Sequence, residues 1–377
     1  MKRPPSGDFQ VIHLVRAAAI LPVLATHLDP IHPASSGWVH WLWDHFQRNG
    51  RYGVCFFFLV SGFLITRILD RGPGAFRADV RQFYVRRAGR ILPLFFLSVA
   101  VGLALAVISR GDVIRHAYCF KLPLNPLDPI FWASLFLFLF NWAEFFCMGA
   151  WQQIGHHWAL FWSLAVEEQF YFAYPWVLRA AGSARKLVWA AGPVFLGAWL
   201  WRWWVLRADG DRNLDLSLGS FGYFDLIAAG CLLYFAQKKW GGAWARRPKL
   251  CWAAALSGFA LVVGVYGSTN FNEATGWVEG PTLLALGLSL FLMGALNLKF
   301  FELGFWKALA WPGKYSYGNY LFHMVVLYFL GMTLRSWDIL PAFLAFAAVS
   351  TGLAALSFHA YEKPLNHWVT RRWGKGG

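Results

Sequence analysis

An arginine and a histidine share one almost entirely apolar stretch near the amino terminus. The stretch FQVIHLVRAAAILPVLATHLDP covers residues 9–30 and contains Arg16 and His27. A helix turns by about 100° per residue, so eleven residues bring the chain back to within roughly 20° of its starting direction. The two side chains would then share one face, about 16 Å apart along the axis. A neutral imidazole acts as a general base towards a hydroxyl, and a guanidinium binds phosphate, carbonyl or carboxylate oxygens.

A structural interpretation of the same two residues stays open. A histidine alone at a helix end is more often a residue that reaches the membrane surface than a catalytic one, and this pattern alone favours that interpretation. The arginine could pair with Glu167 or Asp225 only for packing.

Three arginines precede a second apolar run, in the stretch FYVRRAGRILP at residues 83–93; they are Arg86, Arg87 and Arg90. Arg87 and Arg90 are three residues apart, so in a helical start they would point to the same side. Guanidinium groups at that spacing suit a ligand rich in phosphate. Taken alone, the cluster is more typical of a positively charged membrane anchor or a contact with anionic lipid headgroups.

Polar residues interrupt a further apolar stretch, HHWALFWSLAVEEQFYFAYP; they are Ser163, Glu167, Glu168 and Gln169. Ser163 and Glu167 are four residues apart and share a helix face. Glu167 is placed to orient or pair with His27 or Arg16, which would tune the basicity of the imidazole. A structural ion pair explains two adjacent carboxylates less well, because both cannot point at one partner.

The stretch KYSYGNYLFH at residues 314–323 opens another apolar run. Tyr317, Tyr320 and His323 could line a pore, and Gly318 permits close helix approach. The aromatic residues could equally form a belt at the membrane surface.

The composition predicts an all-α polytopic membrane protein. Of the 377 residues, 58% are hydrophobic and only 14% are charged. The net charge of +15 could suggest nucleic acid, but the positive residues lie in short loops between apolar runs, as in membrane topology. We expect about ten transmembrane helices, near residues 9–28, 52–69, 91–109, 158–178, 187–206, 221–236, 251–267, 281–298, 317–334 and 340–358.

The distribution of Lys and Arg predicts that both termini are cytoplasmic. With that orientation, the cytoplasmic segments hold 23 of the 34 Lys and Arg residues. The first apolar stretch is long and lacks a small-residue cleavage site, so we expect a retained helix and not a removed signal peptide. The whole chain, 1–377, is expected to form one integral-membrane domain with a basic tail at 359–377.

Two outer segments leave questions open. Residues 130–141 are too short to span as a helix, so we expect a partly inserted or interfacial segment, with an eleventh crossing as the competing topology. Cys119 and Cys147 both fall in outer segments and could form a disulfide in an oxidising compartment. No Cys and His cluster has metal-ligand spacing, so no metal is expected.

In their order along the chain these motifs resemble the acyltransferase-3 family of integral membrane acyltransferases. The order is an arginine followed by a histidine with ten residues between them, then RYGVCFFFLVSGFLI, FYVRRAGRILP, FWSLAVEEQFY, YSYGNYLFH and YEKP. The resemblance runs from about residue 9 to about residue 365. The first helix lacks the usual Asp-Gly before the arginine, and Cys55 stands where a polar residue is frequent.

The resemblance implies which residues carry the chemistry. His27 matches the family's essential histidine, with Arg16 as its partner. Arg87 and Arg90, with Arg86 beside them, match the arginines associated with the acyl donor. Ser163, Glu167 and Gln169 match the serine–glutamate–glutamine helix, and no hydrolase-like domain is expected beyond the membrane domain.

The resemblance also implies the reaction. It is transfer of an acyl group, most commonly acetyl, from cytoplasmic acetyl-CoA or another acyl-CoA to a hydroxyl of a cell-surface or exported carbohydrate. Acyl-CoA would be a co-substrate and not a tightly bound cofactor, the acceptor could be lipid-linked, and the chain would reside in a bacterial inner (plasma) membrane among membrane lipids. Alternatives are the sugar of a secreted small molecule as acceptor, a proton-coupled transporter of an anionic solute, and a non-catalytic membrane scaffold.

Overall fold

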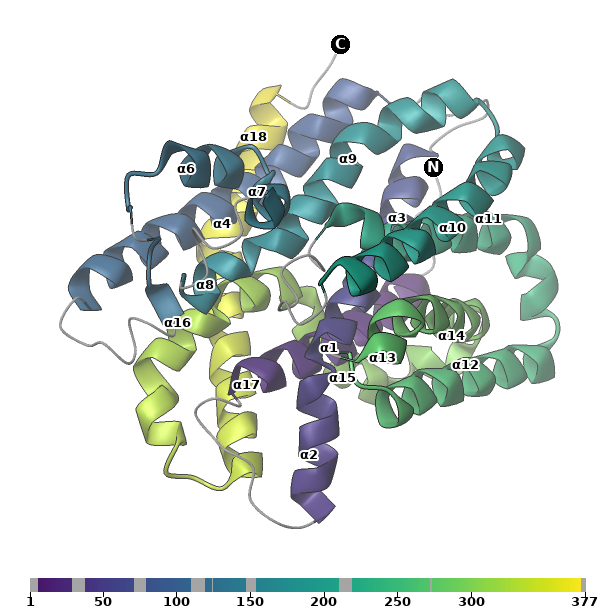
Figure 1. Cartoon of the computed structure of the whole chain (residues 1–377). Helices are drawn as coiled ribbons and strands as arrows, with labels where there is room; N and C mark the ends of the chain where they lie inside the picture. Colours follow the sequence, from purple (N-terminus) through teal and green to yellow (C-terminus); the bar gives the residue numbers. More distant parts are fainter. Residues whose placement is uncertain are drawn as a thin grey trace. The chain divides into compact units, whose positions relative to one another are not determined.

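The protein is described by a computed structural model that covers residues 6–28, 38–70, 79–109, 119–123, 125–146, 154–209, 219–271 and 273–373. Every regular element in these ranges is a helix, as Figure 1 shows. Five helical stretches are long and apolar enough to cross a membrane: Gln10–Leu28, Gly50–Leu69, Val80–Ile108, Pro248–Ser268 and Ile339–Trp373. The expected all-helical membrane architecture is confirmed at this level, and ten crossings with cytoplasmic termini stay a prediction.

Each of the ten expected ranges contains a helix. The helices are α1 (Ser6–Leu28), α3 (Gly50–Leu69), α4 (Val80–Ile108), α9 (Phe161–Ala181), α10 (Ala184–Asp209), α11 (Phe224–Ala245), α12 (Pro248–Ser268), α14 (Gly280–Ala295), α16 (Ser316–Leu334) and α17 (Ile339–Ser357). Hydrophobic runs of this length predict the existence of a helix better than its ends.

The largest difference in helix bounds concerns α4, which begins at Val80 and not near residue 91. The cause is a capping interaction that lies outside the apolar run: the side chain of Asp79 accepts a hydrogen bond of 3.0 Å from the backbone N–H of Gln82. The arginine motif at residues 83–93 therefore lies within the first half of a helix of 29 residues and does not precede it.

Several short helices connect the long ones. They are α2 (Trp38–Arg48), α6 (Pro129–Phe136), α7 (Phe140–Phe146), α8 (His156–Ala159), α13 (Ala274–Val278), α15 (Gly304–Lys314) and α18 (Lys363–Trp373). Residues 130–141 fall on α6 and α7, which are separated by a turn where Phe138 has φ 55°. Neither is long enough to span a bilayer, in agreement with the expectation for this segment. Most of the expected basic tail is helical, as α18, and Cys147 lies outside the described residues.

The chain divides into two compact units. Unit 1 comprises Met1–Thr26, Ala34–Phe76 and Trp176–Lys314, and unit 2 comprises His27–Pro33, Arg77–Pro175 and Tyr315–Gly377. The helices α1 and α9 each begin in one unit and end in the other.

Unit 1 is built on close backbone contacts at glycines. A Cβ on Gly62 of α3 would lie 2.1 Å from the carbonyl oxygen of Ile227, and one on Gly230 of α11 would lie 1.9 Å from that of Leu59. A similar contact joins α12 to α14, where a Cβ on Gly258 would lie 2.4 Å from the Gly287 oxygen. Small residues that let helix backbones meet are the usual packing device of membrane helices.

Unit 2 is built from α4, α6 to α8, most of α9, and α16 to α18. The Asn319 amide of α16 donates a 2.9 Å hydrogen bond to Thr351 of α17, and Gly89 of α4 lies against Val369 of α18. A π-helical turn at Phe358–Glu362 links α17 to α18 and gives the carboxyl-terminal YEKP motif its place beside α4.

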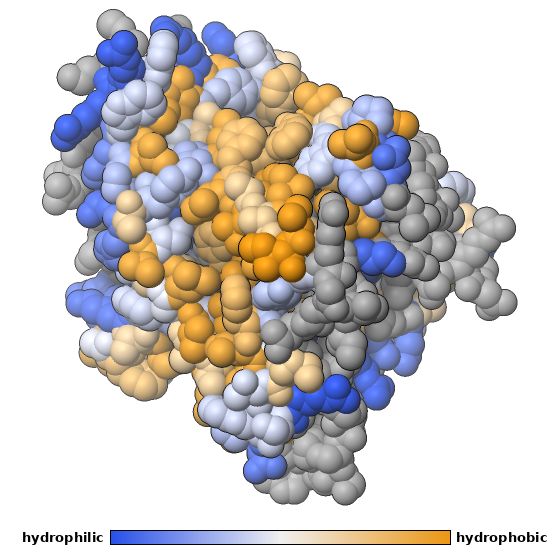
Figure 2. Space-filling model, turned by 90° about the vertical axis from the view of Figure 1, so that its left-hand side faces the viewer, coloured by the Kyte–Doolittle hydropathy of each residue, from blue (hydrophilic) through white to orange (hydrophobic). Residues whose placement is uncertain are grey.

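Large apolar side chains are exposed on both units. Figure 2 shows many of them gathered on the face that it presents, with hydrophilic residues towards its margins. The exposed residues of unit 2 include Phe96, Val107, Ile108, Leu137, Phe329, Leu344 and Leu356. A face of this kind matches the hydrocarbon of a bilayer.

Candidate active site

Three histidines from three helices converge in unit 2. His27 lies in the last turn of α1, and its ring centroid is 4.8 Å from that of His323 on α16. It is also 5.8 Å from the ring centroid of His156, the first residue of α8, and both pairs meet edge to face. His27 and His323 were expected to belong to the site. His156 was not, although its sequence neighbourhood HHWALFW pointed to the site.

The hydrogen bonds of His323 define its tautomer. Its Nδ1 lies 2.8 Å from the carbonyl oxygen of Tyr320 and 3.2 Å from that of Asn319. A carbonyl oxygen only accepts, so Nδ1 carries the proton and Nε2 carries a lone pair. Nε2 is buried and has no hydrogen-bond partner among the described residues. The histidine cluster therefore contains a fixed acceptor nitrogen whose bonding capacity is unused.

His156 adds a neutral imidazole. Protein atoms surround much of its ring although the residue keeps an open surface, and this desolvation lowers the pKa of His156 below its ordinary value. The lowered pKa favours the neutral form of the His156 imidazole at pH 7. In the part of the chain that the structure describes, no group of three or more His, Cys, Asp or Glu side chains is arranged to hold a metal ion.

Tyr320 and Ser163 join α16 to α9 next to the histidines. The Tyr320 hydroxyl is 2.6 Å from the Ser163 Oγ and donates a 3.0 Å hydrogen bond to the carbonyl oxygen of Leu160. The Tyr320 ring centroid is 6.1 Å from that of His323. These two expected pore residues hold the helix that carries His323.

A second polar group lies further along α9. The hydroxyl of Tyr171 donates a 3.0 Å hydrogen bond to Glu167, and the guanidinium carbon of Arg87 lies 4.3 Å from the Tyr171 ring centroid. Glu167 is seven residues beyond Leu160, which corresponds to about 10 Å along the helix. The role that the sequence suggested for Glu167 beside the His27 imidazole stays a prediction.

Arg90 is part of the same group. The charges of Glu167 and Glu362 act on its guanidinium, and the Tyr171 hydroxyl is also near it. Tyr317 donates a 3.0 Å hydrogen bond to the Ile91 carbonyl oxygen and so fixes α16 to α4 at this level. Glu362 was missed as a site residue, although the YEKP motif that contains it was recognised.

Glu168 and Arg86, two further expected site residues, differ in burial. The Oε1 atom of Glu168 is buried and has no hydrogen-bond partner among the described residues. Arg86 is exposed. We define Arg87, Arg90, Glu167, Glu168 and Glu362, with Tyr171 and Tyr317, as the arginine cluster.

Gln169 and Arg16 do not belong to either cluster. The Gln169 amide donates to the Phe138 carbonyl oxygen at 2.8 Å and to Asn141 at 2.9 Å, and it accepts from Trp142 at 3.1 Å. It therefore holds the turn between α6 and α7. Arg16 is half-buried on α1 and belongs to unit 1.

Comparison with known proteins identifies the family. The family model described as an acyltransferase domain matches residues 9–359. Over 372 residues the chain is 25% identical to "Putative O-acetyltransferase SACOL0978" of Staphylococcus aureus strain COL, covering 93% of this chain and 56% of that protein. Over 332 residues it is 23% identical to the O-acetyltransferase OatA of Staphylococcus aureus strain NCTC 8325 / PS 47, covering 84% of this chain and 50% of that protein.

The chain thus spans about half the length of these relatives. No solved structure matches it. The family match covers nearly all of the chain. Four of the ordered motifs, FYVRRAGRILP, FWSLAVEEQFY, YSYGNYLFH and YEKP, contribute residues to the two clusters, whereas RYGVCFFFLVSGFLI lies on α3 of unit 1. On these grounds the chain belongs to the acyltransferase-3 family.

Proposed function

We propose that this protein is a membrane O-acetyltransferase that moves an acetyl group from acetyl-CoA to a hydroxyl of a cell-envelope or exported carbohydrate. The observation that carries the proposal is the convergence of His27 with His156 and His323, one of which has an unused acceptor nitrogen. Family membership supports acyl transfer, and the names of the relatives support acetyl as the group.

The arginine cluster is suited to the donor. Arg87 and Arg90 present two guanidinium groups on one side of α4, and exposed Arg86 adds a third positive charge towards solvent. Guanidinium forks bind phosphate oxygens in pairs, which matches the nucleotide end of coenzyme A. The unused Oε1 of Glu168 is a suitable acceptor for an amide N–H of the pantetheine arm.

The histidine cluster is suited to the transfer step. His27 removes the proton of the acceptor hydroxyl while that oxygen forms a bond to the thioester carbonyl carbon. The C–S bond then breaks, the acetyl ester is released, and the thiolate of coenzyme A takes the proton from the His27 imidazolium. The protein therefore returns to its starting protonation state without a further reactant.

His323 has a positioning role in this scheme. Its Nε2 is an unpartnered acceptor, and the centroids of the His323 and His27 rings are 4.8 Å apart, so in this scheme Nε2 accepts an N–H from the His27 ring as that ring turns to bind the acceptor. Such a bond would orient the base and stabilise its protonated form, as an orienting residue does in a catalytic triad.

An acetyl-histidine intermediate is a different route through the same residues. A burst of free coenzyme A in the absence of acceptor, equal in amount to the enzyme, would identify it. The direct route predicts steady release only when acceptor is present.

The site of action and the acceptor complete the proposal. We place the protein in a bacterial inner membrane with the arginine cluster towards the cytoplasm, because acetyl-CoA is cytoplasmic and the positive residues favour this orientation. The acceptor is a surface or exported glycan, including a lipid-linked precursor, and the sugar of a secreted small molecule is the alternative acceptor.

The test uses membrane vesicles that contain the full chain and acetyl-CoA labelled in the acetyl group. Wild type should move label into extractable glycan or lipid-linked material, and His27→Ala should lower the rate by about 10² to 10⁴. The matched control is His367→Ala, because His367 is an exposed histidine on α18. Equal rates for wild type and His27→Ala at equal amounts of folded protein would refute the role of His27.

A further inference from the structure

Unit 1 contains an apolar groove that the acyl-transfer reaction does not use. It has a volume of about 530 Å³ and is formed by α10, α11 and α14. The lining residues are Phe195, Ala229, Leu232, Leu233, Ala236, Trp240, Trp244, Thr282, Ala285, Leu286, Ser289, Leu290 and Met293. The volume lies in the range of about 300–1,000 Å³ that is typical of pockets for small molecules.

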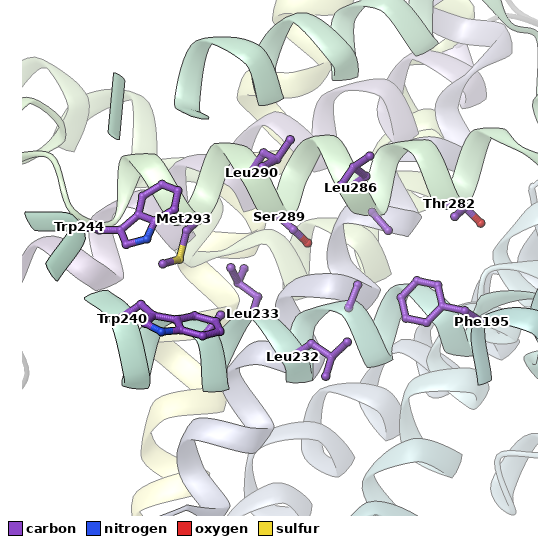
Figure 3. A pocket seen from close by; sticks show the side chains of 13 residues that line it. Phe195, Leu232, Leu233, Trp240, Trp244, Thr282, Leu286, Ser289, Leu290 and Met293 are labelled. Carbon is purple, nitrogen blue, oxygen red and sulfur yellow. The ribbon is translucent and has the colours of Figure 1, made fainter. Parts of the chain in front are cut away.

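The groove is elongated along the helices. Figure 3 shows Phe195 and Thr282 at one end and Trp240, Trp244 and Met293 at the other. Thr282 and Met293 are eleven residues apart on α14, which is about 16 Å along the axis. One leaflet of a bilayer has a hydrocarbon thickness of about 15 Å, so the groove has the length of one lipid acyl chain.

The Thr282 end offers no free polar group to a ligand. The Thr282 hydroxyl donates a 2.9 Å hydrogen bond to Asp225 and accepts a 2.6 Å hydrogen bond from Arg202. Apart from Thr282 and Ser289, the lining side chains are aliphatic, aromatic or methionine. The interior of the groove therefore suits hydrocarbon.

The other end carries positive charge. Residues 236–250 contain five Lys and Arg residues and no Asp or Glu. Lys238 is paired with Asp70, so its charge is largely offset. The ammonium of Lys239 lies 4.8 Å from the ring centroid of Trp240, which lines the groove, and exposed Arg246 and Arg247 follow at the end of α11. Tryptophan and lysine at one level are typical of the region of lipid headgroups.

We propose that this groove binds one acyl chain of an anionic phospholipid, with the phosphate at Lys239 and the chain between α11 and α14. Charge complementarity selects this occupant: an anionic headgroup matches the residual charge at the Trp240 end, and the acyl chain matches the apolar length. A mutual pair of amide hydrogen bonds between Gln237 and Asn297, at 3.1 and 3.0 Å, holds the two helices together at that end. The proposal does not depend on the identity of the acetyl acceptor.

The test is photo-labelling of the full-length protein in vesicles. The vesicles are phosphatidylcholine with a small fraction of phosphatidylglycerol, and one of the two lipids carries a diazirine in its acyl chain. Labelled phosphatidylglycerol should cross-link to α11 and α14 several-fold more than labelled phosphatidylcholine. Lys239→Gln should lower the phosphatidylglycerol cross-link about fivefold, as expected for one lysine near an anionic surface.

Matched variants make the result decisive. Ser289→Trp fills the groove and should abolish the cross-link, whereas Leu256→Trp on the exposed face of α12 should leave it unchanged. The charge control is Lys307→Gln, because Lys307 is exposed on α15 away from this sequence segment. Equal labelling by the two lipids, or labelling that survives both Lys239→Gln and Ser289→Trp, would overturn the proposal.

Discussion

The two units differ in how completely their charged side chains are paired. In unit 1, Arg202 and Asp225 are fully buried and face each other at 2.8 Å, and the two terminal nitrogens of Arg202 also bond Gly222 and Thr282. In unit 2, Arg87 stacks on a tyrosine ring, and Glu168 Oε1 has no hydrogen-bond partner among the described residues.

The difference separates structural charge from functional charge. In this pair the terminal nitrogens of Arg202 and the carboxylate of Asp225 bond each other and their neighbours, and only the Nε of Arg202 lacks a hydrogen-bond partner among the described residues, so the pair leaves little capacity for a ligand. Charged and polar groups with unused capacity carry an energetic cost that a bound substrate is able to remove. We therefore expect the substrates to bind in unit 2, where Glu168 Oε1 and His323 Nε2 lack described partners, and we assign the Arg202–Asp225 pair to the fold.

The largest expected effect is a loss of stability when the buried Arg202–Asp225 pair of unit 1 is broken. Asp225→Ala leaves the Arg202 guanidinium buried without its counter-charge and should lower the free energy of unfolding by about 3–5 kcal/mol. Denaturant or thermal unfolding of the purified protein in detergent measures the change. The control is Asp44→Ala, because Asp44 and Arg48 form a surface pair at 3.8 Å that should contribute about 1 kcal/mol or less.

A second variant distinguishes the pair from other effects of the substitution. Arg202→Met combined with Asp225→Leu removes both charges and should recover much of the lost stability. A double variant as unstable as Asp225→Ala would show that the unpaired Arg202 charge does not cause the loss of stability. The structural role assigned to the Arg202–Asp225 pair would then be wrong.

The next effect is a loss of transfer rate when the unpartnered acceptor nitrogen of His323 in unit 2 is removed. His323→Phe keeps an aromatic ring but removes the fixed Nε2 acceptor, so the rate of acetyl transfer should fall about 100-fold while KM for acetyl-CoA and the unfolding temperature change little. Transfer assays with acceptor in excess give both parameters. A loss of stability that parallels the loss of rate would assign His323 to the fold.

His157 provides the matched control for His323. It is buried beside α4, and its Nε2 donates a 3.1 Å hydrogen bond to the carbonyl oxygen of Ser98. Its Nδ1 also lacks a hydrogen-bond partner among the described residues, but its ring packs against Phe120 and Trp158, so the two histidines differ in their neighbours. His157→Phe should lower stability and leave the rate per folded molecule near that of wild type. The two substitutions therefore have opposite expected profiles.

A smaller effect concerns the donor. Arg87→Lys keeps the positive charge but loses the planar guanidinium that stacks on Tyr171 at 4.3 Å. KM for acetyl-CoA should rise about five- to tenfold, which corresponds to about 1 kcal/mol, with kcat nearly unchanged. Arg86→Lys is the control, since the side chain of Arg86 is exposed. Equal changes in the two variants would argue for a general effect of charge.

Much of the fold followed from the sequence because apolar runs of 16 residues or more have few alternatives to a helix in a membrane. The α4 boundary did not follow, since it depends on the Asp79 cap outside the apolar run. The turn between α6 and α7 could not be predicted from the sequence either. Phe138 adopts φ 55° there, and its carbonyl oxygen accepts a hydrogen bond from Gln169, which is 31 residues further along the chain.

The site was predictable to the extent that its residues carry unusual types in an apolar setting. His27, Arg87, Arg90, Glu167, Glu168 and His323 stand out for that reason. Their partners do not: the approach of His156 to His27 and the influence of Glu362 on Arg90 join segments far apart in the chain. Spacing within one helix gives no information on such contacts. The direction of the Gln169 amide, towards the α6–α7 turn, is likewise a tertiary property.

The smallest effect tests the criterion of unused capacity itself. Glu168→Gln removes a carboxylate whose buried Oε1 has no described partner, so stability should stay equal or rise by about 1 kcal/mol. A residue that pairs only for structure would give the opposite sign, as Asp225 is expected to do. If Glu168 accepts an amide N–H of the pantetheine arm, the neutral glutamine retains the acceptor oxygen, and KM for acetyl-CoA should change less than threefold. Glu168→Leu, which removes that oxygen, should raise KM further at unchanged stability. A clear loss of stability in Glu168→Gln would mean that this carboxylate belongs with the Arg202–Asp225 pair and not with the site.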